Sequence, residues 1–541
     1  MGVSLQLFLL FAHTLIMKKN KLLSGVVLLS VFGLLAKAVG AIYRIPLTHI
    51  LTSEGMGLYQ MVFPLYSLLL ALSSSGFPAS ISKLVSGYNA RNEQKKAKSI
   101  LNRSLSMLLI FSSICALLVL LFGTKISALQ GNSEAGILYI AIAPAIVLVG
   151  VISAYRGYFQ GYENMMPSSV SLLIEQVGKL GAGILLAKIL GKYGVVFATL
   201  GAILGVVVSE ILCLMFLMIC YFLQKRKQVQ NLSIGENLSK SDARRQILSV
   251  VVPITIGGII MPISMFIDST LVVNLLTSSG FSSKYSTSLF GLSSGVVGSI
   301  VNMPVVFSAA ITTSLLPLAS KAFSKGNKRG VEKNISLSLI MNFVIILPMS
   351  IVVFFFSDMI INFLYSGCLS HAQFETSSLL LKFGAFSVVY LSIVQISTTA
   401  LQSIGKTIVP VFSLFLGVVL KIILTVILVK NPTINIYGMM IASCVCYAVA
   451  GTINLIVLLK NVKFMYARDL TKCLVSNILF ASACVISKKV VQSFSSGRLS
   501  LVLAVLGLMV VLGLVYYVMY KKEVNTFLMR KIKVKKQLNK T

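Results

Sequence analysis

The side chains in this sequence that could do chemistry are a few charged residues within long apolar runs. Arg44 and Lys37 lie seven residues apart in one run, so on a helix they share a face, two turns apart. A guanidinium keeps its charge and binds phosphate oxygens in a bidentate manner, which makes Arg44 the first candidate to hold a diphosphate. Arg44 lies near one end of its run and could instead reach lipid headgroups. Because charged residues inside a bilayer usually serve function, we favour the first interpretation.

The acidic residues in such runs have different expected partners. Glu175 precedes Lys179 by four residues, the favourable order for a helical ion pair. This pair could line a cavity, or it could neutralise itself so that the helix inserts into lipid. Asp268 has no cation at helical spacing, so it either pairs across helices or binds a coupling cation or proton. Glu210 is expected to be a structural charge that faces the bundle. The predicted substrate-binding cations are Arg44, Lys37, Lys179 and Lys421, and the candidate ion-coupling carboxylates are Asp268 and Glu175.

Neither catalysis nor metal binding is indicated by the remaining polar residues. The longest loop on the outer side, around residues 358–375, offers only the scattered Asp358, His371 and Glu375, where a membrane-bound transferase needs clustered carboxylates or histidines. Cys444 and Cys446 lie two residues apart and do not share a helix face, and the three histidines are far apart in sequence. We therefore expect no enzyme, no metal and no cofactor, and any energetic coupling would come from H⁺, Na⁺ or the membrane potential.

The elements that must position these residues are membrane-spanning helices. Hydrophobic residues make up 57% of the chain and charged residues 11%, and the mean hydropathy is +0.93. A soluble domain carries roughly 25% charged residues, so the solvent of this fold is lipid. A bilayer crossing needs about 20 apolar residues, and the sequence predicts an all-α integral membrane protein of about fourteen such helices. The runs are 22–47, 56–85, 101–122, 137–155, 168–190, 195–223, 247–276, 289–318, 335–356, 376–400, 407–429, 436–459, 474–491 and 499–520.

The lysines and arginines indicate the orientation of these spans. The net charge is +33, and most of the basic residues gather in alternate loops. By the positive-inside rule, this places both termini in the cytoplasm and requires an even number of spans in the cytoplasmic membrane. The charge is therefore a topology signal, with contact to anionic lipids as a secondary effect, and does not indicate nucleic acid. The basic segments are 18–21, 91–103, 225–245, 321–333, 460–472 and 521–540.

The chain repeats itself at a spacing of about 240 residues. The segment that begins at Asn102 resembles the one that begins at Asn334, and Lys179 and Tyr193 recur as Lys421 and Tyr437, at offsets of 242 and 244. A duplication of this length predicts two six-helix lobes. Because each lobe has an even number of spans, the copies form a parallel repeat around a central cavity, with two further helices at the C-terminus.

These features divide the chain into five predicted segments. Residues 1–16 are expected to be an extension outside the fold, because the run from Val3 to Ile16 is too short to span a bilayer and Met17 resembles a natural start. Residues 17–228 form the N-lobe and residues 229–465 the C-lobe. Residues 466–522 form the two last helices, and residues 523–541 a basic cytoplasmic tail.

Six short motifs stand out along the chain. They are YRIPL (43–47), EGMGLYQM (54–61), SGFPASISK (75–83), RGYFQG (156–161), NMMP (164–167) and LQSIGK (401–406). Together they resemble the motifs of the stage V sporulation protein B and polysaccharide-transporter family, within the multidrug/oligosaccharidyl-lipid/polysaccharide flippase superfamily. The resemblance covers residues 17 to about 520. It implies two lobes that give alternating access to a cavity holding the headgroup of a lipid-linked precursor.

Two functions from this superfamily are weighed. The related lipid II flippases place cations along their first helix, and Lys37 and Arg44 fall near two of those positions; their second-helix arginine is absent from the neutral stretch 66–69. The leading hypothesis is a flippase that moves an undecaprenyl-pyrophosphate-linked peptidoglycan (lipid II-like) or related glycan precursor to the outer leaflet, for cell wall or spore cortex. The alternative is a cation-coupled multidrug exporter, which would need an acidic cavity. The expected partners are this substrate, membrane lipids and a candidate cell-wall synthase, with a monomer as the expected state.

Overall fold

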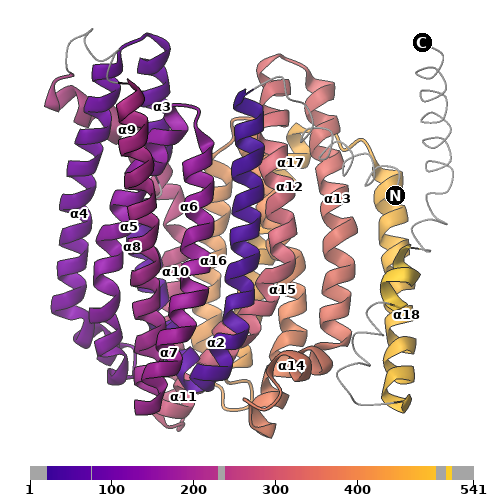
Figure 1. The fold of residues 1–541 in the computed structure, drawn as a ribbon. Helices are drawn as coiled ribbons and strands as arrows, with labels where there is room; N and C mark the ends of the chain where they lie inside the picture. Colours follow the sequence, from indigo (N-terminus) through magenta and orange to yellow (C-terminus); the bar gives the residue numbers. More distant parts are fainter. Residues whose placement is uncertain (1–20, 75, 229–237, 495–506, 514–541) are drawn as a thin grey trace.

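The computed structural model describes residues 21–74, 76–228, 238–494 and 507–513. Within these ranges all regular structure is helical, and the long helices run side by side in one bundle (Figure 1). This confirms the predicted all-α membrane fold. The proposed extension 1–16, the tail 523–541 and most of the last predicted span, 499–520, lie outside the described residues.

Twelve of the described helical stretches are long and apolar enough to cross a membrane. The first, Leu28–Ala90, has 63 residues, which at 1.5 Å per residue is about three times the thickness of a bilayer. It folds back inside α2 (Lys21–Ser74), where Thr52 has φ 61° and ψ −176°. As a result Lys37, before the reversal, and Tyr66, after it, line the same cavity. Counted as two spans, this stretch brings the described crossings to thirteen, and the total of fourteen stays a prediction.

The remaining elements follow the predicted order of the two lobes. The N-lobe continues with α3 (Phe77–Ala90), α4 (Gln94–Leu129), η1 (Ser133–Ala135), α5 (Gly136–Gly161), α6 (Met165–Gly178), η2 (Lys179–Gly183), α7 (Ile184–Leu190), η3 (Gly191–Tyr193) and α8 (Val195–Gln228). The C-lobe contains α9 (Lys240–Gly258), α10 (Ile260–Ser278), α11 (Ser283–Phe290), η5 (Gly291–Val297), α12 (Gly298–Ser324), α13 (Lys328–Phe355), α14 (Ser357–Tyr365), α15 (His371–Ser403), α16 (Ile408–Val429) and α17 (Tyr437–Asn461). α18 (Ala467–Phe494) packs on α13 at the edge of the bundle (Figure 1).

The predicted span 247–276 is broken in the structure into α9 and α10. The break falls after Gly258, and Pro262 lies in the first turn of α10, where a missing N–H is tolerated. α9 packs on α3 and α4. There Tyr88 donates a hydrogen bond to Gln246 Oε1 (2.7 Å) and Ser80 donates one to the Ile247 carbonyl (3.2 Å). The first helix after the basic linker is thus held against the N-lobe.

Glycines bring the fifth and sixth spans of each lobe close together. A Cβ added at Gly205 would lie 2.2 Å from Gly183 Cα, and one added at Gly417 would lie 2.7 Å from the Cys446 carbonyl oxygen. In lipid, helices associate through close van der Waals packing rather than through a hydrophobic driving force. Small residues at these crossings therefore hold each lobe together.

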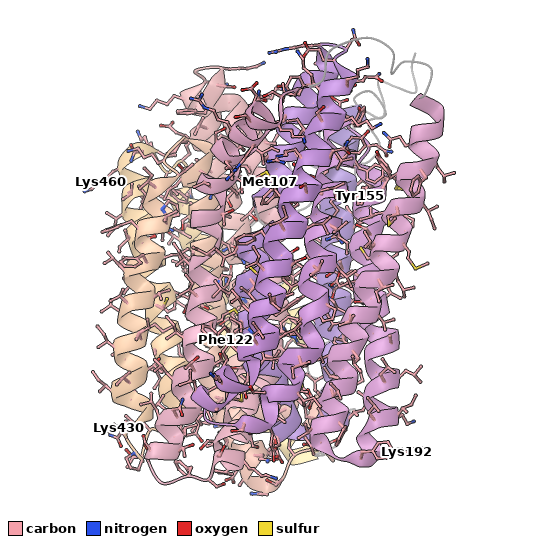
Figure 2. The ribbon with its side chains drawn as sticks, turned by 90° about the vertical axis from the view of Figure 1, so that its left-hand side faces the viewer. Met107, Phe122, Tyr155, Lys192, Lys430 and Lys460 are labelled. Atoms are coloured by element: carbon pink, nitrogen blue, oxygen red, sulfur yellow. The ribbon has the colours of Figure 1, made fainter. Side chains whose placement is uncertain are left out.

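The two lobes meet at the end of the bundle where Lys192 and Lys430 lie, opposite Lys460 (Figure 2). A Cβ added at Gly57 would lie only 2.0 Å from the carbonyl oxygen of Thr287 on α11. Hydrogen bonds surround this crossing, including Asn132 Nδ2 to Thr287 Oγ1 (3.0 Å), Gln130 Nε2 to Ser269 Oγ (3.0 Å) and Ser288 Oγ to Ser53 Oγ (2.7 Å). The lobes are therefore closed together at this end of the bundle.

Gly57→Ala is expected to destabilise this closed arrangement. The added methyl group has no space beside the Thr287 backbone, and overpacking of this kind costs about 1–3 kcal/mol. We expect a lower midpoint of thermal unfolding for the purified protein in detergent. Gly87→Ala is the matched control, because no atom lies within 4 Å of a Cβ at that position. Equal midpoints for the two variants would contradict the packing described.

Candidate functional site

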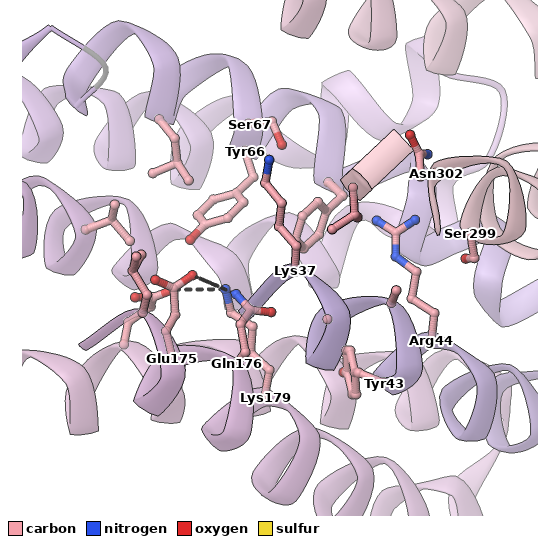
Figure 3. Close-up of a pocket in the computed structure, with 18 of the residues that line it drawn as sticks. Lys37, Tyr43, Arg44, Tyr66, Ser67, Glu175, Gln176, Lys179, Ser299 and Asn302 are labelled. Atoms are coloured by element: carbon pink, nitrogen blue, oxygen red, sulfur yellow. Dashed lines mark hydrogen bonds and ion pairs between the residues drawn. The ribbon is translucent and has the colours of Figure 1, made fainter. Parts of the chain in front are cut away.

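A cavity of about 590 Å³ lies within the bundle, lined by α2, α5, α6, η2 and α8 of the N-lobe and by α12 and α15 of the C-lobe (Figure 3). Its volume is in the range of small-ligand sites. Its polar lining includes four basic and two acidic side chains, a net charge of +2 with all six ionised. These are Lys37, Arg44, Arg156, Lys179, Glu175 and Glu210.

Lys37 and Arg44 enter the cavity from the first limb of α2. Figure 3 shows the Arg44 guanidinium turned toward Asn302 of α12 and the Lys37 ammonium beside Ser67. Among the described residues, neither side chain forms an ion pair or a hydrogen bond through its charged end. Two turns of helix separate them, so they present positive charge at two levels of the same cavity. The predicted shared face is therefore turned toward the cavity.

Glu175 forms ion pairs with two cations at once. Its Oε1 lies 2.7 Å from Lys179 Nζ, and its Oε2 lies 3.0 Å from Arg156 Nη2. Arg156 also donates to Ser171 Oγ (2.8 Å). The predicted helical pair is confirmed, and it both lines the cavity and compensates charge. Lys179 begins η2, a π-helical turn of the kind often found at functional sites.

Arg156 is a cavity residue that the sequence prediction missed. Its span was expected to end at Tyr155, whereas α5 continues to Gly161. Arg156 was therefore placed just outside the membrane. The signal that could have found it is its position at the start of the RGYFQG motif.

Glu210 faces the bundle, as expected, and also borders the cavity. It is 1% exposed and comes from α8. Lys179 Nζ lies 3.2 Å from its Oε1, yet neither carboxylate oxygen accepts a hydrogen bond from any described residue. The ammonium is close enough for charge attraction but lies off the direction of a hydrogen bond. Of the two carboxylates near Lys179, Glu175 accepts hydrogen bonds and Glu210 accepts none from the described residues.

Asp268 and Lys421 lie elsewhere in the C-lobe. They form a buried ion pair between α10 and α16, each 5% exposed, and Ser264 Oγ lies 3.4 Å from the Lys421 ammonium. Of the two alternatives for Asp268, the structure shows pairing across helices. Neither residue belongs to the lining of the cavity described above, so Lys421 is separated from the other three predicted cations.

Three tyrosines of α2 add an aromatic wall to the cavity. Tyr43, Tyr59 and Tyr66 all belong to the lining, and the Tyr59 ring stacks on Phe63 at 5.0 Å between centroids. Such rings offer both an apolar face and a hydroxyl group. Apolar runs of sequence do not reveal which of their tyrosines face a cavity, and this wall was not predicted. No cluster of three or more metal-ligating side chains occurs among the described residues.

Asp268→Asn is expected to destabilise the protein strongly, because it leaves the Lys421 ammonium buried without a counter-charge. Breaking a buried pair in this way costs about 3–5 kcal/mol. The double variant with Lys421→Met should recover most of the loss, measured by thermal unfolding in detergent. Glu134→Gln is the control: it removes an exposed ion pair to Lys284 (3.6 Å), worth about 0–1 kcal/mol. An Asp268→Asn protein as stable as the parent would show that this pair does not hold α10 to α16.

Comparison with known proteins agrees with this architecture. The model of the family described as "Polysaccharide biosynthesis protein" matches residues 22–323, and the MatE family model matches residues 253–427. Stage V sporulation protein B of Bacillus subtilis is 29% identical over 318 residues, which cover 58% of this chain and 61% of that protein. The chain thus matches about three fifths of the length of that relative. The lipid II flippase MurJ of the same organism is 24% identical over 529 residues, covering 92% and 94% of the two chains.

Solved structures show the same fold. A lipid II flippase MurJ in an inward closed conformation superposes with a TM-score of 0.68 at 16% identity, covering 92% of this chain and all of that one. An inward-facing multidrug resistance MATE family transporter superposes with a TM-score of 0.66 at 15% identity, covering 78% and 93%. The chain therefore belongs to the polysaccharide biosynthesis protein family of the multidrug/oligosaccharidyl-lipid/polysaccharide flippase superfamily, and it is a multi-pass membrane protein.

Proposed function

We propose that this protein is a flippase that carries a lipid-linked glycan precursor with a diphosphate group, such as an undecaprenyl-pyrophosphate-linked peptidoglycan precursor, from the cytoplasmic to the outer leaflet. The observation that carries the proposal is the pair Lys37 and Arg44, two cations with no ion-pair partner among the described residues in a cavity of net charge +2. An isolated anion pays a prohibitive desolvation cost in hydrocarbon. A cavity that offers free cations removes that barrier.

The arrangement of the cavity suits a headgroup that combines a diphosphate and a sugar. Arg44 can bind phosphate oxygens in a bidentate manner, and Lys37 supplies a second charge about two turns along the same helix. Tyr43, Tyr59 and Tyr66 give the cavity an aromatic wall, with rings that are almost completely buried. The lipid tail would remain in the bilayer while the headgroup occupies the cavity.

A multidrug exporter for cationic compounds is less well supported. The likeness to MATE transporters consists of the MatE family match over residues 253–427 and a shared fold at 15% identity. A cationic drug would need free carboxylates, and both carboxylates of this cavity lie against Lys179. The charge of the site therefore favours an anionic substrate.

Alternating access would require the outer contact between the lobes to open. This contact includes glycine packing and side-chain hydrogen bonds around Gly57 and Thr287, and opening it would also separate buried apolar side chains that the two lobes contribute to one cluster. The membrane potential could drive outward movement, because a negative headgroup gains about 2.3 kcal/mol per charge per 100 mV. The named relatives are a flippase and a sporulation protein, so we propose transport without catalysis, in cell-wall or spore-cortex synthesis. A cell-wall synthase remains the proposed partner, and a monomer the proposed state.

Arg44→Ala should reduce flipping at least tenfold, because the headgroup loses its bidentate ligand. Arg44→Lys keeps the charge but not the planar fork, so its activity should be intermediate. The measurement is the appearance of the diphosphate-linked precursor on the outer face of cells or proteoliposomes that contain equal amounts of each protein. Lys192→Ala, an exposed lysine outside the cavity, is the matched control. Full activity of Arg44→Ala would exclude Arg44 from the mechanism.

We also propose that both termini lie in the cytoplasm, which can be tested from the loops. Lys192 and Lys430 lie at one end of the bundle and Lys460 at the other (Figure 2). In a variant with Cys368→Ser, a cysteine placed at Lys192 should react with a membrane-impermeant maleimide in intact cells. A cysteine placed at Lys460 should react only after the membrane is opened. The reverse pattern would invert the topology and the direction of transport.

A further inference from the structure

Glu210 lies in a position that lets it exchange a proton when the cavity is filled. It is almost completely buried, its two oxygens accept no hydrogen bond from the described residues, and its nearest charge is Lys179 Nζ at 3.2 Å. A charged carboxylate in that setting depends mainly on the ammonium that it shares with Glu175, with a weaker attraction from Arg156, which forms no ion pair with it. Any anion that attracts this ammonium into the cavity removes most of the compensation from Glu210.

The charged groups around Glu210 show why it, and not its neighbour, would respond. Glu175 on α6 accepts hydrogen bonds from Lys179 of η2 and from Arg156 of α5, so it stays compensated if Lys179 turns away. From α2, the neutral hydroxyl of Tyr66 lies near this group, and it has no hydrogen-bond partner among the described residues. The lysines of α7 and η3, Lys188 and Lys192, are exposed and do not line the cavity. Glu210 is thus the carboxylate with no second cation in contact.

The other lobe shows that the fold does not require a carboxylate at this position. The repeat offset of 244 that relates Tyr193 to Tyr437 places Asn454 at the position of Glu210. Asn454 is fully buried: its Oδ1 accepts from Ser413 Oγ (2.7 Å), and its Nδ2 donates to Thr398 Oγ1 (3.2 Å). A neutral, fully hydrogen-bonded side chain therefore serves the structural role in the C-lobe. The presence of a carboxylate, Glu210, at this position of the N-lobe is therefore not explained by packing alone.

We propose that Glu210 is a proton-binding site linked to the substrate cavity, so that an anionic diphosphate headgroup binds together with one proton. The inference rests on the proposed function, since it needs an anion in the cavity. The anion and Glu210 compete for Lys179, and protonation of Glu210 ends the competition while raising the net charge of the lining from +2 to +3. Binding should therefore be tighter at lower pH, and the substrate and the proton promote each other's binding by the same factor.

The test measures binding and proton uptake together on the purified full-length chain in lipid nanodiscs. The probe is UDP-N-acetylglucosamine, a diphosphate diester whose phosphates carry no titratable proton near neutral pH. Linkage to one proton predicts an affinity that rises by up to about tenfold per unit decrease in pH. Calorimetry in buffers of different ionisation enthalpy should show about one proton taken up per probe bound. Glu210→Gln should bind the probe with little pH dependence and no proton uptake.

Glu163→Gln is the matched control, since Glu163 is an exposed glutamate in the turn between α5 and α6 and should behave like the parent. Proton uptake that persists in Glu210→Gln would overturn the assignment. If Glu210→Gln fails to fold, the same two measurements on the parent protein test the inference. Probe binding without pH dependence or proton uptake would overturn the inference but not the proposed function. Absence of probe binding by the parent at any pH would overturn both.

Discussion

A charge inside a bilayer must be compensated or enclosed, and this constraint organises the interior of the protein. Most of the described intramembrane charges have partners: Glu175 holds Arg156 and Lys179, and Asp268 holds Lys421. Lys37 and Arg44 lack such partners among the described residues and face a cavity instead. The cavity is positive because the fold leaves these two cations uncompensated.

The two lobes each have a lysine at the equivalent position of the repeat, Lys179 and Lys421, and the two lysines have different surroundings. Lys421 has one carboxylate partner, which reaches it from another helix, and it lies outside the lining of the cavity. Lys179 has two carboxylates and borders the cavity. The repeated position is thus part of a buried ion pair in one lobe and part of the cavity lining in the other. The charged residues of the cavity come from the N-lobe, and α12 and α15 of the C-lobe complete its lining.

The contact between the lobes combines close backbone packing and polar hydrogen bonds with buried apolar side chains that both lobes contribute to one core cluster. Backbones approach closely at Gly57 and Thr287, and the surrounding bonds join polar side chains such as Asn132. Hydrogen bonds of this kind can be exchanged for water if the lobes separate, at a small net cost. Within each lobe, glycine contacts such as Gly205 on Gly183 bring neighbouring helices close together.

The sequence by itself determined the all-α membrane class of the fold, most of its spans and the Glu175–Lys179 pair, because bilayer thickness and helical spacing act locally along the chain. Only the tertiary structure decided that Asp268 pairs with Lys421, that Arg156 joins the cavity, and that the span after the basic linker breaks into α9 and α10. These features depend on which helices become neighbours and how each is rotated. That choice is made by packing between different helices, which lie 153 residues apart for Asp268 and Lys421 and 19 for Arg156 and Glu175, and no local pattern records it.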